Sequence, residues 1–241
     1  MQFIDTHLHL QDYKSKDAPQ ILDAAAAAGV REFVCPAVRE ADWMEVSRLA
    51  AAFPLRIVAA FGLHPWYAGE ALPGWEQRLR RCLKEHPQAL IGECGLDRLK
   101  NPGQQPQQEV FAGHIRIAAE LNRPLLIHAV KAQDWLESFW PQLQKVRFVL
   151  HSFGGSVEFL RRAVHFGAYI SFAPTVRRRS NYAELAAAVP AERLLLESDG
   201  PYQGTPSDIA MMAEEIAVFR GEAEADLAAR VYLNSREFIN V

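Results

Sequence analysis

Two histidines separated by one residue lie near the start of the chain, where their spacing is suited to metal binding. His7 and His9 follow the short apolar segment Phe3-Ile4, which is typical of a β-strand. In an extended segment, residues i and i+2 point to the same side, so both imidazoles can approach one ion. Imidazole is a common ligand of zinc and other transition-metal ions. The pair alone is a weak signal, so the hypothesis depends on further ligands elsewhere in the chain.

Further potential ligands stand at the ends of other predicted strands. Any one of these histidines is more readily explained as a hydrogen-bonded core residue than as a ligand. Their repeated placement just after strands, on one predicted face, favours a shared site, because unrelated histidines would not sort in this way. These further potential ligands are His64, Glu93, His128, His151 and Asp199.

The pattern of apolar segments predicts eight strands with helices between them. Several of the strands are continuous apolar runs, as expected where both faces of a strand are buried. Strands are predicted at residues 3–4, 32–35, 56–61, 89–91, 125–127, 148–150, 168–172 and 194–196. Helices are predicted at residues 17–28, 42–53, 107–121, 156–166, 207–219 and 224–238, and a loop is predicted at residues 99–106.

Eight strands and their helices in 241 residues match the count and length of a (β/α)8 TIM barrel. We therefore predict a single α/β domain over residues 1–241, with the active site at the mouth formed by the C-terminal ends of the strands. An open doubly wound sheet is the alternative, and the absence of a Gly-x-Gly-x-x-Gly turn after the first strand disfavours it. No linker, low-complexity tract or tandem repeat divides the chain.

The composition excludes several classes of protein. A net charge of −3 gives no broad basic surface of the kind that a high-affinity duplex-binding protein shows, although a nuclease site can hold phosphate through metal ions. Three cysteines without paired spacing fit a reducing cytoplasm. No secretory leader and no segment of membrane-spanning length is found, so we expect a cytoplasmic protein without a membrane partner. The sequence does not give the oligomeric state, and a monomer is the simplest expectation.

The ligand set suits two divalent metal ions. One ion would be held by the histidines after the first strand and the aspartate after the last, and the other by the histidines after the fifth and sixth strands. A glutamate after the fourth strand can bridge the ions, because a carboxylate offers one oxygen to each. Two ions roughly 3.5–4 Å apart can clamp a phosphate and activate a water, so no Ser or Cys nucleophile is required. The first set is His7, His9 and Asp199, the second is His128 and His151, and the bridge is Glu93.

Other residues near the predicted mouth are candidates for catalysis or substrate binding. Asp199 could also orient or deprotonate the attacking water. His64 could contact a phosphate or leaving group, or it could fix the Pro65-Trp66 turn, and both hypotheses stay open. Glu197 should share its strand face with Asp199 and orient a ligating histidine from behind.

A basic run and two aromatic residues are the candidates for nucleic-acid contacts. Phosphate sites of barrels often use the loops after strands 7 and 8, where the basic run lies, although charge runs are usually only solvated. The aromatic residues could stack on bases or simply cap the barrel core. The basic run is Arg177, Arg178 and Arg179, and the aromatic residues are Trp66 and Tyr202.

Seven segments, spread in order over nearly the whole chain, together resemble the motifs of one family. They are residues 3–9 (FIDTHLH), 62–65 (GLHP), 91–97 (IGECGLD), 124–128 (PLLIH), 151–155 (HSFGG), 195–202 (LLESDGPY) and 234–238 (NSREF). The chain thereby resembles the TatD family of metal-dependent hydrolases, within the amidohydrolase-like TIM barrels. The resemblance implies a two-metal site with the ligands named above, loaded with Zn, Mg or Mn. It also implies phosphodiester hydrolysis on DNA, often as a 3′ exonuclease that acts on single strands or 3′ ends.

Several residues at the mouth depart from the family's pattern. The Arg that usually stands two positions after the histidine of residues 124–128 is replaced by Val130, with Lys131 next. Arg98 replaces a usual aromatic residue, and the segment after Tyr202 lacks the usual R-G-x-x-N-x-P stretch. Two alternatives to a deoxyribonuclease therefore stay open: a metal-dependent hydrolase of another ester or amide bond, and a non-catalytic barrel protein. The complete ligand set disfavours the second alternative.

Overall fold

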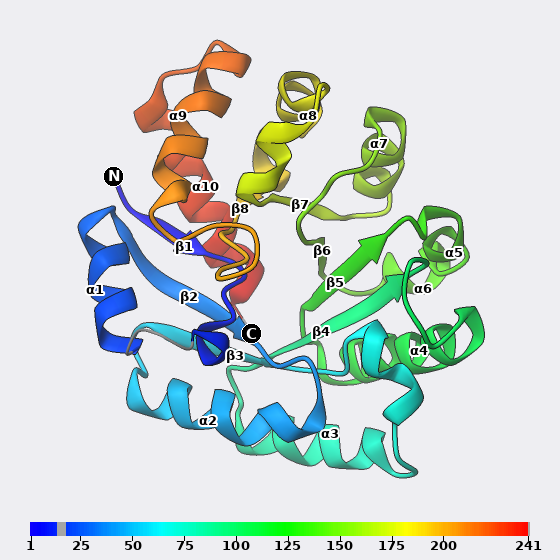
Figure 1. The fold of residues 1–241 in the computed structure, drawn as a ribbon. Coiled ribbons are helices and arrows are strands. Elements are labelled where there is room, and N and C mark those ends of the chain that lie inside the picture. The colour runs from blue at the N-terminus through cyan, green and yellow to red at the C-terminus, as the bar shows by residue number, and fades with distance from the viewer. Residues whose placement is uncertain (14–17, 241) are drawn as a thin grey trace.

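A computed structural model describes residues 1–13 and 18–240, and it shows a barrel of eight parallel strands (Figure 1). The strands pair in chain order from β1 to β8. They are β1 (Phe3–Asp5), β2 (Val30–Pro36), β3 (Ile57–Phe61), β4 (Leu90–Asp97), β5 (Leu125–Val130), β6 (Phe148–Leu150), β7 (Tyr169–Phe172) and β8 (Leu194–Leu196). The predicted (β/α)8 barrel is confirmed, and the single domain over residues 1–241 stays a prediction.

Backbone hydrogen bonds join the last strand to the first and close the barrel. The amide of Thr6 donates to the carbonyl oxygen of Leu196 at 3.2 Å, and the amide of Asp199 donates to the carbonyl oxygen of His7 at 2.9 Å. Just beyond these bonds, Leu8 and Gly200 form a parallel bridge. Closure therefore places the segment that follows β1 beside the segment that follows β8.

An apolar layer inside the barrel receives one residue from each strand. Successive side chains of a strand alternate between its faces, so Val34 lies in this inner layer while Phe33 and Cys35 belong to the outer core. Phe238 of the last helix packs against Tyr169 at the start of β7, so it closes the barrel end away from the mouth. The strand members of the layer are Ile4, Val34, Ala60, Leu90, Leu126, Val149, Tyr169 and Leu195.

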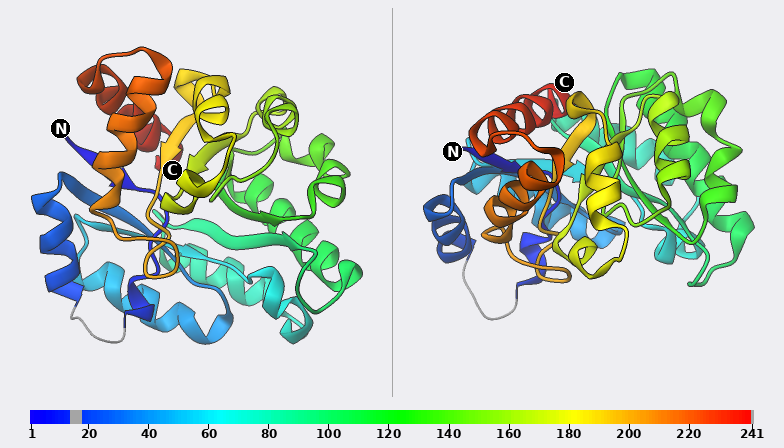
Figure 2. Two further views of the ribbon diagram at one scale, coloured as in Figure 1. Left: turned by 45° about the horizontal axis from the view of Figure 1, so that its top comes forward. Right: turned by 90° about the horizontal axis from the view of Figure 1, so that it is seen from above.

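Helices surround the strands on the outside, and Figure 2 shows this ring from two further directions. In the described part of the chain the α-helices are α1 (Ala18–Ala27), α2 (Trp43–Ala52), α3 (Trp75–Glu85), α4 (Gln104–Leu121), α5 (Gln133–Glu137), α6 (Trp140–Leu143), α7 (Val157–His165), α8 (Tyr182–Ala188), α9 (Asp208–Arg220) and α10 (Glu224–Ile239). Short 3-10 helices are η1 (Leu10–Asp12), η2 (Glu40–Asp42), η3 (Pro65–Glu70), η4 (Pro174–Arg178) and η5 (Ala191–Arg193). None of the described helices combines the length and apolar character needed to cross a membrane.

The six predicted helices are present, and the structure adds α3, α5, α6 and α8, which the apolar pattern did not predict. The predicted start of the first helix at residue 17 lies outside the described residues. The predicted loop at residues 99–106 is wrong at its end, because α4 already begins at Gln104. Pro106 does not prevent this early start, since the first turn of a helix tolerates proline.

Two glycines allow neighbouring strands to approach each other at the mouth. A Cβ atom at Gly62 would lie 2.8 Å from the carbonyl oxygen of Glu93. A Cβ atom at Gly95 would lie 2.1 Å from the carbonyl oxygen of His128, with which Gly95 is in register across β4 and β5. Gly95 also has a φ of 137°, a conformation that residues with side chains rarely adopt. The approach of β4 to β5 therefore depends on glycine at position 95.

We predict that Gly95→Ala destabilises the fold by about 2–4 kcal/mol, because the new methyl group overlaps the backbone of β5 and the residue must keep an unfavourable φ. Urea unfolding followed by circular dichroism measures the change. Gly103→Ala is the matched control, since a Cβ atom there meets nothing within 4 Å; we expect it to cost less than about 1 kcal/mol. Equal effects of the two substitutions would show that the close approach at Gly95 is unimportant.

Candidate metal centre

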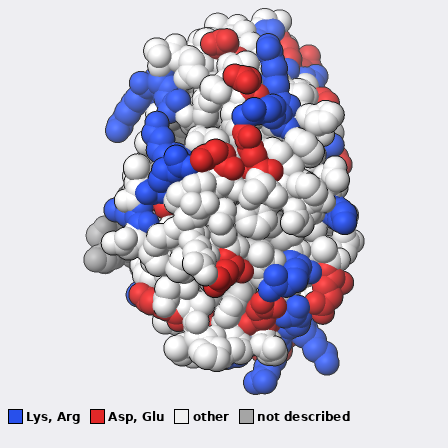
Figure 3. Space-filling view, turned by 90° about the vertical axis from the view of Figure 1, so that its right-hand side faces the viewer, with Lys and Arg blue, Asp and Glu red and all other residues white. Residues whose placement is uncertain are grey.

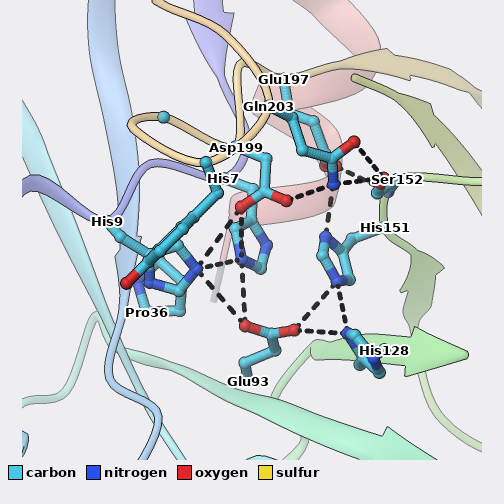
Figure 4. Close-up of polar contacts among 12 residues, drawn as sticks. His7, His9, Pro36, Glu93, His128, His151, Ser152, Glu197, Asp199 and Gln203 are labelled. Atoms are coloured by element: carbon cyan, nitrogen blue, oxygen red, sulfur yellow. Dashed lines mark hydrogen bonds and ion pairs between the residues drawn. The ribbon is translucent and has the colours of Figure 1, made fainter. Parts of the chain in front are cut away.

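Glu93 lies in the middle of a cluster of imidazoles at the mouth, and its two carboxylate oxygens face different groups (Figure 4). The residue belongs to β4 and is only 3% exposed. Its neighbours come from β5 and from the segments that follow β1, β3, β6 and β8. The structure thus brings together every residue that the sequence predicted as a metal ligand.

One oxygen of Glu93 faces the histidines that follow β1. Its Oε2 lies 3.3 Å from His7 Nε2 and 3.5 Å from His9 Nε2. Asp199 completes this group, since its Oδ1 lies 3.5 Å from His9 Nε2 and 4.0 Å from His7 Nε2. The ligand atoms of His7, His9 and Asp199 all lie within 4.8 Å of one another, which is close enough to hold one ion.

The other oxygen of Glu93 faces three further imidazoles. Its Oε1 lies 2.9 Å from His151 Nε2, 3.0 Å from His128 Nδ1 and 3.2 Å from His64 Nε2. His128 and His151 also approach each other directly, with 3.2 Å between Nδ1 and Nε2. Glu93 therefore stands between two sets of potential ligands and offers one oxygen to each set.

Carboxylates behind His151 and His128 determine which ring nitrogens carry protons. Glu197 Oε1 lies 3.2 Å from His151 Nδ1 and accepts the amide hydrogen of Ser152 at 2.6 Å. Asp97 Oδ2 lies 3.3 Å from His128 Nε2. A neutral histidine that donates from one nitrogen presents a lone pair from the other, so His151 Nε2 and His128 Nδ1 turn lone pairs toward Glu93.

Lone pairs and a carboxylate at these distances repel one another unless a positive charge lies among them. The residues therefore fit a divalent cation, whose ligands are neutral imidazoles and carboxylates. Without a cation, a bound proton supplies the positive charge. Burial alone would lower the pKa of His151, but Glu93 and Glu197 raise this pKa well above its usual range. Burial alone would likewise raise the pKa of Glu93, but the imidazoles of His64, His151 and His7 lower it well below its usual range.

Two polar side chains that the sequence did not single out link the segments after β1 and β8. Asp5 Oδ1 accepts the amide hydrogens of Ser198 at 2.9 Å and of His7 at 3.2 Å, and Asp5 Oδ2 accepts the Ser198 hydroxyl at 2.6 Å. These bonds fix the backbone at His7 relative to the backbone before Asp199. The Asp5–Ser198 pair therefore holds the two halves of one ligand set together.

Asp97 is a further site residue that was not predicted from the sequence, and Gln203, described next, is another. Asp97 accepts hydrogen bonds from the Trp66 indole at 2.7 Å and from the amide of Leu99 at 2.9 Å. Burial alone would raise the pKa of Asp97, but its bonds to His128 and Trp66 lower it to about 2. Residues 93 and 97 share one face of β4, so strand periodicity could have indicated Asp97.

Gln203 holds the carboxylate of Asp199 from the side opposite His9. Its Nε2 donates to Asp199 Oδ2 and also to the hydroxyl of Ser152, the latter at 2.7 Å, and its Oε1 accepts from the hydroxyl of Thr175. The partners come from segments after β6, β7 and β8. No local pattern predicts such a contact, because it depends on how three separate loops fold over the mouth.

His64 follows β3 in a turn that fixes the position of its proton. Its Nδ1 accepts the amide hydrogen of Trp66 at 3.2 Å, so the proton of the neutral ring lies on Nε2 and faces Glu93. Burial lowers the pKa of His64 to about 4, which keeps the ring neutral near pH 7. In this form His64 is a hydrogen-bond donor toward the site, and it also holds the turn at Trp66.

His114 of α4 supports the same turn from the core. Its Nε2 accepts the amide hydrogen of Leu63 at 3.1 Å, and its Nδ1 donates to the carbonyl oxygen of Val110 at 2.8 Å. The bond that Nε2 accepts requires the neutral ring, and burial lowers the pKa of His114 to about 4. Protonation would leave the Leu63 amide without its acceptor and would place a charge in the core.

A cavity of about 280 Å³ lies over the ligand cluster and has an aromatic rim. Trp66 and Tyr202 both line it and are substantially exposed, so the two predicted stacking residues border the site. The Tyr202 hydroxyl donates to Asp12 at 2.9 Å, which anchors the ring beside His9. Tyr67 is a further aromatic residue of the same wall.

The three arginines of the basic run after β7, residues 177–179, have different surroundings in the structure. Arg177 donates to both carboxylate oxygens of Glu215, at 2.8 and 2.9 Å, and its guanidinium is therefore occupied. Arg178 is exposed and lines neither this cavity nor a neighbouring hollow of about 310 Å³, whereas Arg179 lines that hollow. Figure 3 shows that Lys and Arg side chains on the α4–α7 side form separate groups with carboxylates between them. The positive charge on this side therefore lies in separate small groups and does not form one continuous basic surface.

Comparison with known proteins identifies the family to which this chain belongs. The family model for "TatD related DNase" matches residues 4–240. The chain belongs to the TatD related DNase family. A relative from Pantoea vagans (strain C9-1), named 3'-5' ssDNA/RNA exonuclease TatD, is 30% identical over an alignment 243 residues long, and this alignment includes 92% of this chain and 93% of the relative.

A further relative and a solved structure agree with this assignment. A Haemophilus influenzae protein, named an uncharacterized metal-dependent hydrolase, is 29% identical and is matched over 86% of each chain. Among solved structures, the TatD homolog YJJV from Escherichia coli K12 has a TM-score of 0.88 and 26% identity, with 99% of this chain and 97% of that chain covered. The predicted family and the predicted class, a hydrolase that acts on ester bonds, are confirmed. The assignment of individual residues to metal and substrate stays a proposal.

We predict that the free energy of unfolding falls by up to about 3 kcal/mol through His114 alone as the pH decreases from about 6.5 to about 4. The sign follows because the unfolded chain binds this proton at a higher pH than the folded chain does. The stabilising contribution is therefore complete above the ordinary histidine pKa and is lost as the pH falls toward the folded value.

The contribution of His114 is isolated by urea unfolding of wild type and His114→Gln between pH 4.5 and 7.5. The pH is changed in steps of roughly half a unit at constant ionic strength. We expect a shallower pH dependence in His114→Gln. His165→Gln, an exposed histidine of α7, is the control and should keep the wild-type slope. Parallel curves for wild type and His114→Gln would refute a neutral buried imidazole.

Proposed function

We propose that this protein is a divalent-metal-dependent nuclease that hydrolyses phosphodiester bonds of single-stranded nucleic acid, working from a 3′ end. The observation that carries the proposal is the placement of Glu93, whose two oxygens face two separate sets of ligands. The name of the Pantoea vagans relative, a 3'-5' ssDNA/RNA exonuclease, supports the substrate and the polarity. A cytoplasmic location and a monomeric state stay predictions.

The chain offers ligands for two ions, one on each side of Glu93. Bound divalent ions would supply the positive charge that neutralises a phosphate and activates a water. Zn, Mg and Mn are the candidate metals, and the histidine-rich donor set favours Zn or Mn over Mg. The residues that would hold the ions are His7, His9 and Asp199 on one side, His128 and His151 on the other, and Glu93 between them.

Asp199 is suited to accept the proton of the attacking water. Its Oδ2 is engaged by Gln203, while its Oδ1 points toward His9 and the site. The carboxylate lies at the wall of the cavity and is 6% exposed, so a water that it orients is largely shielded from bulk solvent. Asp199 is therefore placed to orient this water and to take its proton.

His64 is suited to contact the phosphate or the leaving oxygen. It lines the cavity, and among the described residues its Nε2 hydrogen has only Glu93 as a partner. A phosphate oxygen that enters the cavity offers this hydrogen a second acceptor. The neutral state of His64 makes it a hydrogen-bond donor at pH 7 without adding a charge to the site.

The aromatic rim favours an unpaired end of a strand over a duplex. Base–aromatic stacking needs an exposed base face, which only an unpaired base offers. Trp66 and Tyr202 line the cavity from two different segments, one after β3 and one after β8. The limited positive charge of the chain agrees with recognition of a terminus by the site itself.

We expect the purified protein to cleave single-stranded DNA when Zn²⁺, Mn²⁺ or Mg²⁺ is added after treatment with a chelator. Glu93→Gln, which keeps the size of the side chain and removes its charge, should lower kcat at least roughly 100-fold and reduce the metal content of the protein. Elemental analysis and release of mononucleotides from a 3′-labelled oligonucleotide are the measurements.

Glu45→Gln is the matched control, because within the part of the chain that the structure describes Glu45 makes only an exposed pair with Arg48 on α2; this variant should behave like wild type. Retained metal together with full activity in Glu93→Gln would contradict the two-sided role of this carboxylate. Metal binding without cleavage of any nucleic acid would instead move the proposal to hydrolysis of another ester or amide bond.

A further inference from the structure

A second hollow of about 310 Å³ opens directly beside the ligand cluster. It shares Ala129, Val130 and Ser152 with the cavity over the cluster, so the two spaces are contiguous. Ala129 follows His128 and Ser152 follows His151, which places the second hollow next to the ligands on the Oε1 side of Glu93. A strand bound at the ligand cluster can therefore continue into this hollow.

Two cations stand at the wall of the hollow without a carboxylate partner. Lys131 and Arg179 both line it, and within residues 1–13 and 18–240 neither of them forms an ion pair. Toward the described residues, the guanidinium of Arg179 makes one long hydrogen bond, 3.3 Å from its Nε to the side-chain oxygen of Asn181. The nearby Arg177, by contrast, is bound by Glu215. Cations that face a cavity and have no internal partner are available to an anionic ligand.

The rest of the lining suits a nucleotide unit more than a free inorganic ion. Phe153 and Val176 are buried and form an apolar part of the wall. Gln133 and Thr175 add polar groups that can bond to phosphate or sugar oxygens. A sugar can rest against the apolar part while its phosphate lies between Lys131 and Arg179.

We propose that this hollow, the Lys131–Arg179 subsite, binds the phosphodiester group next to the one that is cleaved. The proposal rests on the proposed nuclease function and adds to it a requirement on the substrate: a charged linkage one nucleotide away from the scissile bond. A strand with two charged linkages then gains contacts that a single linkage cannot make. The subsite lies beside the ligands on the Oε1 side of Glu93, so it also fixes the side of the cluster on which the strand continues.

The test uses the metal-loaded protein and the trinucleotide TpTpT, in which one linkage at a time is replaced by an uncharged methylphosphonate. We expect that neutralising the linkage next to the cleaved one lowers kcat/KM roughly tenfold in the wild type, the loss typical of a hydrogen bond to a charged group. In the double variant Lys131→Ala/Arg179→Ala, the same replacement should have little further effect, since the subsite no longer distinguishes a charged from a neutral linkage.

Arg161→Ala is the matched control, because it removes an exposed positive charge on α7 outside both hollows and should keep the wild-type sensitivity. Cleavage that is indifferent to the methylphosphonate in the wild type would overturn the subsite alone, and so would full sensitivity in the double variant. If TpTpT and single-stranded DNA are not cleaved with any of the three metals, both the subsite and the nuclease function are overturned.

Discussion

A buried carboxylate surrounded by imidazole nitrogens is the constraint on which the rest of this structure depends. Glu93 presents Oε2 to the two histidines after β1 and Oε1 to the histidine of β5 and the histidine after β6, all within about 3.5 Å. Such an arrangement is stable only if positive charge lies among these atoms. In the proposed function, one cation on each side of this carboxylate supplies that charge, which connects the fold to metal-dependent hydrolysis.

The barrel satisfies this constraint through backbone positions and through the residues behind the ligands. Closure between β1 and β8 brings His7 and Asp199 together, and Asp5 fixes both segments by accepting hydrogen bonds from them. Glycine at position 95 lets β4 lie close to β5, so that Glu93 and His128 can meet. Carboxylates behind two of the imidazoles then select the tautomer that turns a lone pair inward.

Much of this arrangement could be predicted from the sequence, because it follows from strand periodicity and barrel closure. Eight apolar runs indicated the strands, and polar residues just after them indicated one shared mouth. Helix α3 was not predicted, since its sequence is mostly charged and buries only Leu79 and Leu83. The ion pair between Arg177 and Glu215 and the contacts of Gln203 join separate loops, and no local pattern encodes such contacts.

The most direct test of this account is an anomalous difference map from crystals of the protein loaded with Zn²⁺ or Mn²⁺. The account predicts two peaks, one beside Glu93 Oε2 with His7, His9 and Asp199, and one beside Oε1 with His128 and His151. A single peak on one side of Glu93, or peaks away from this carboxylate, would contradict it.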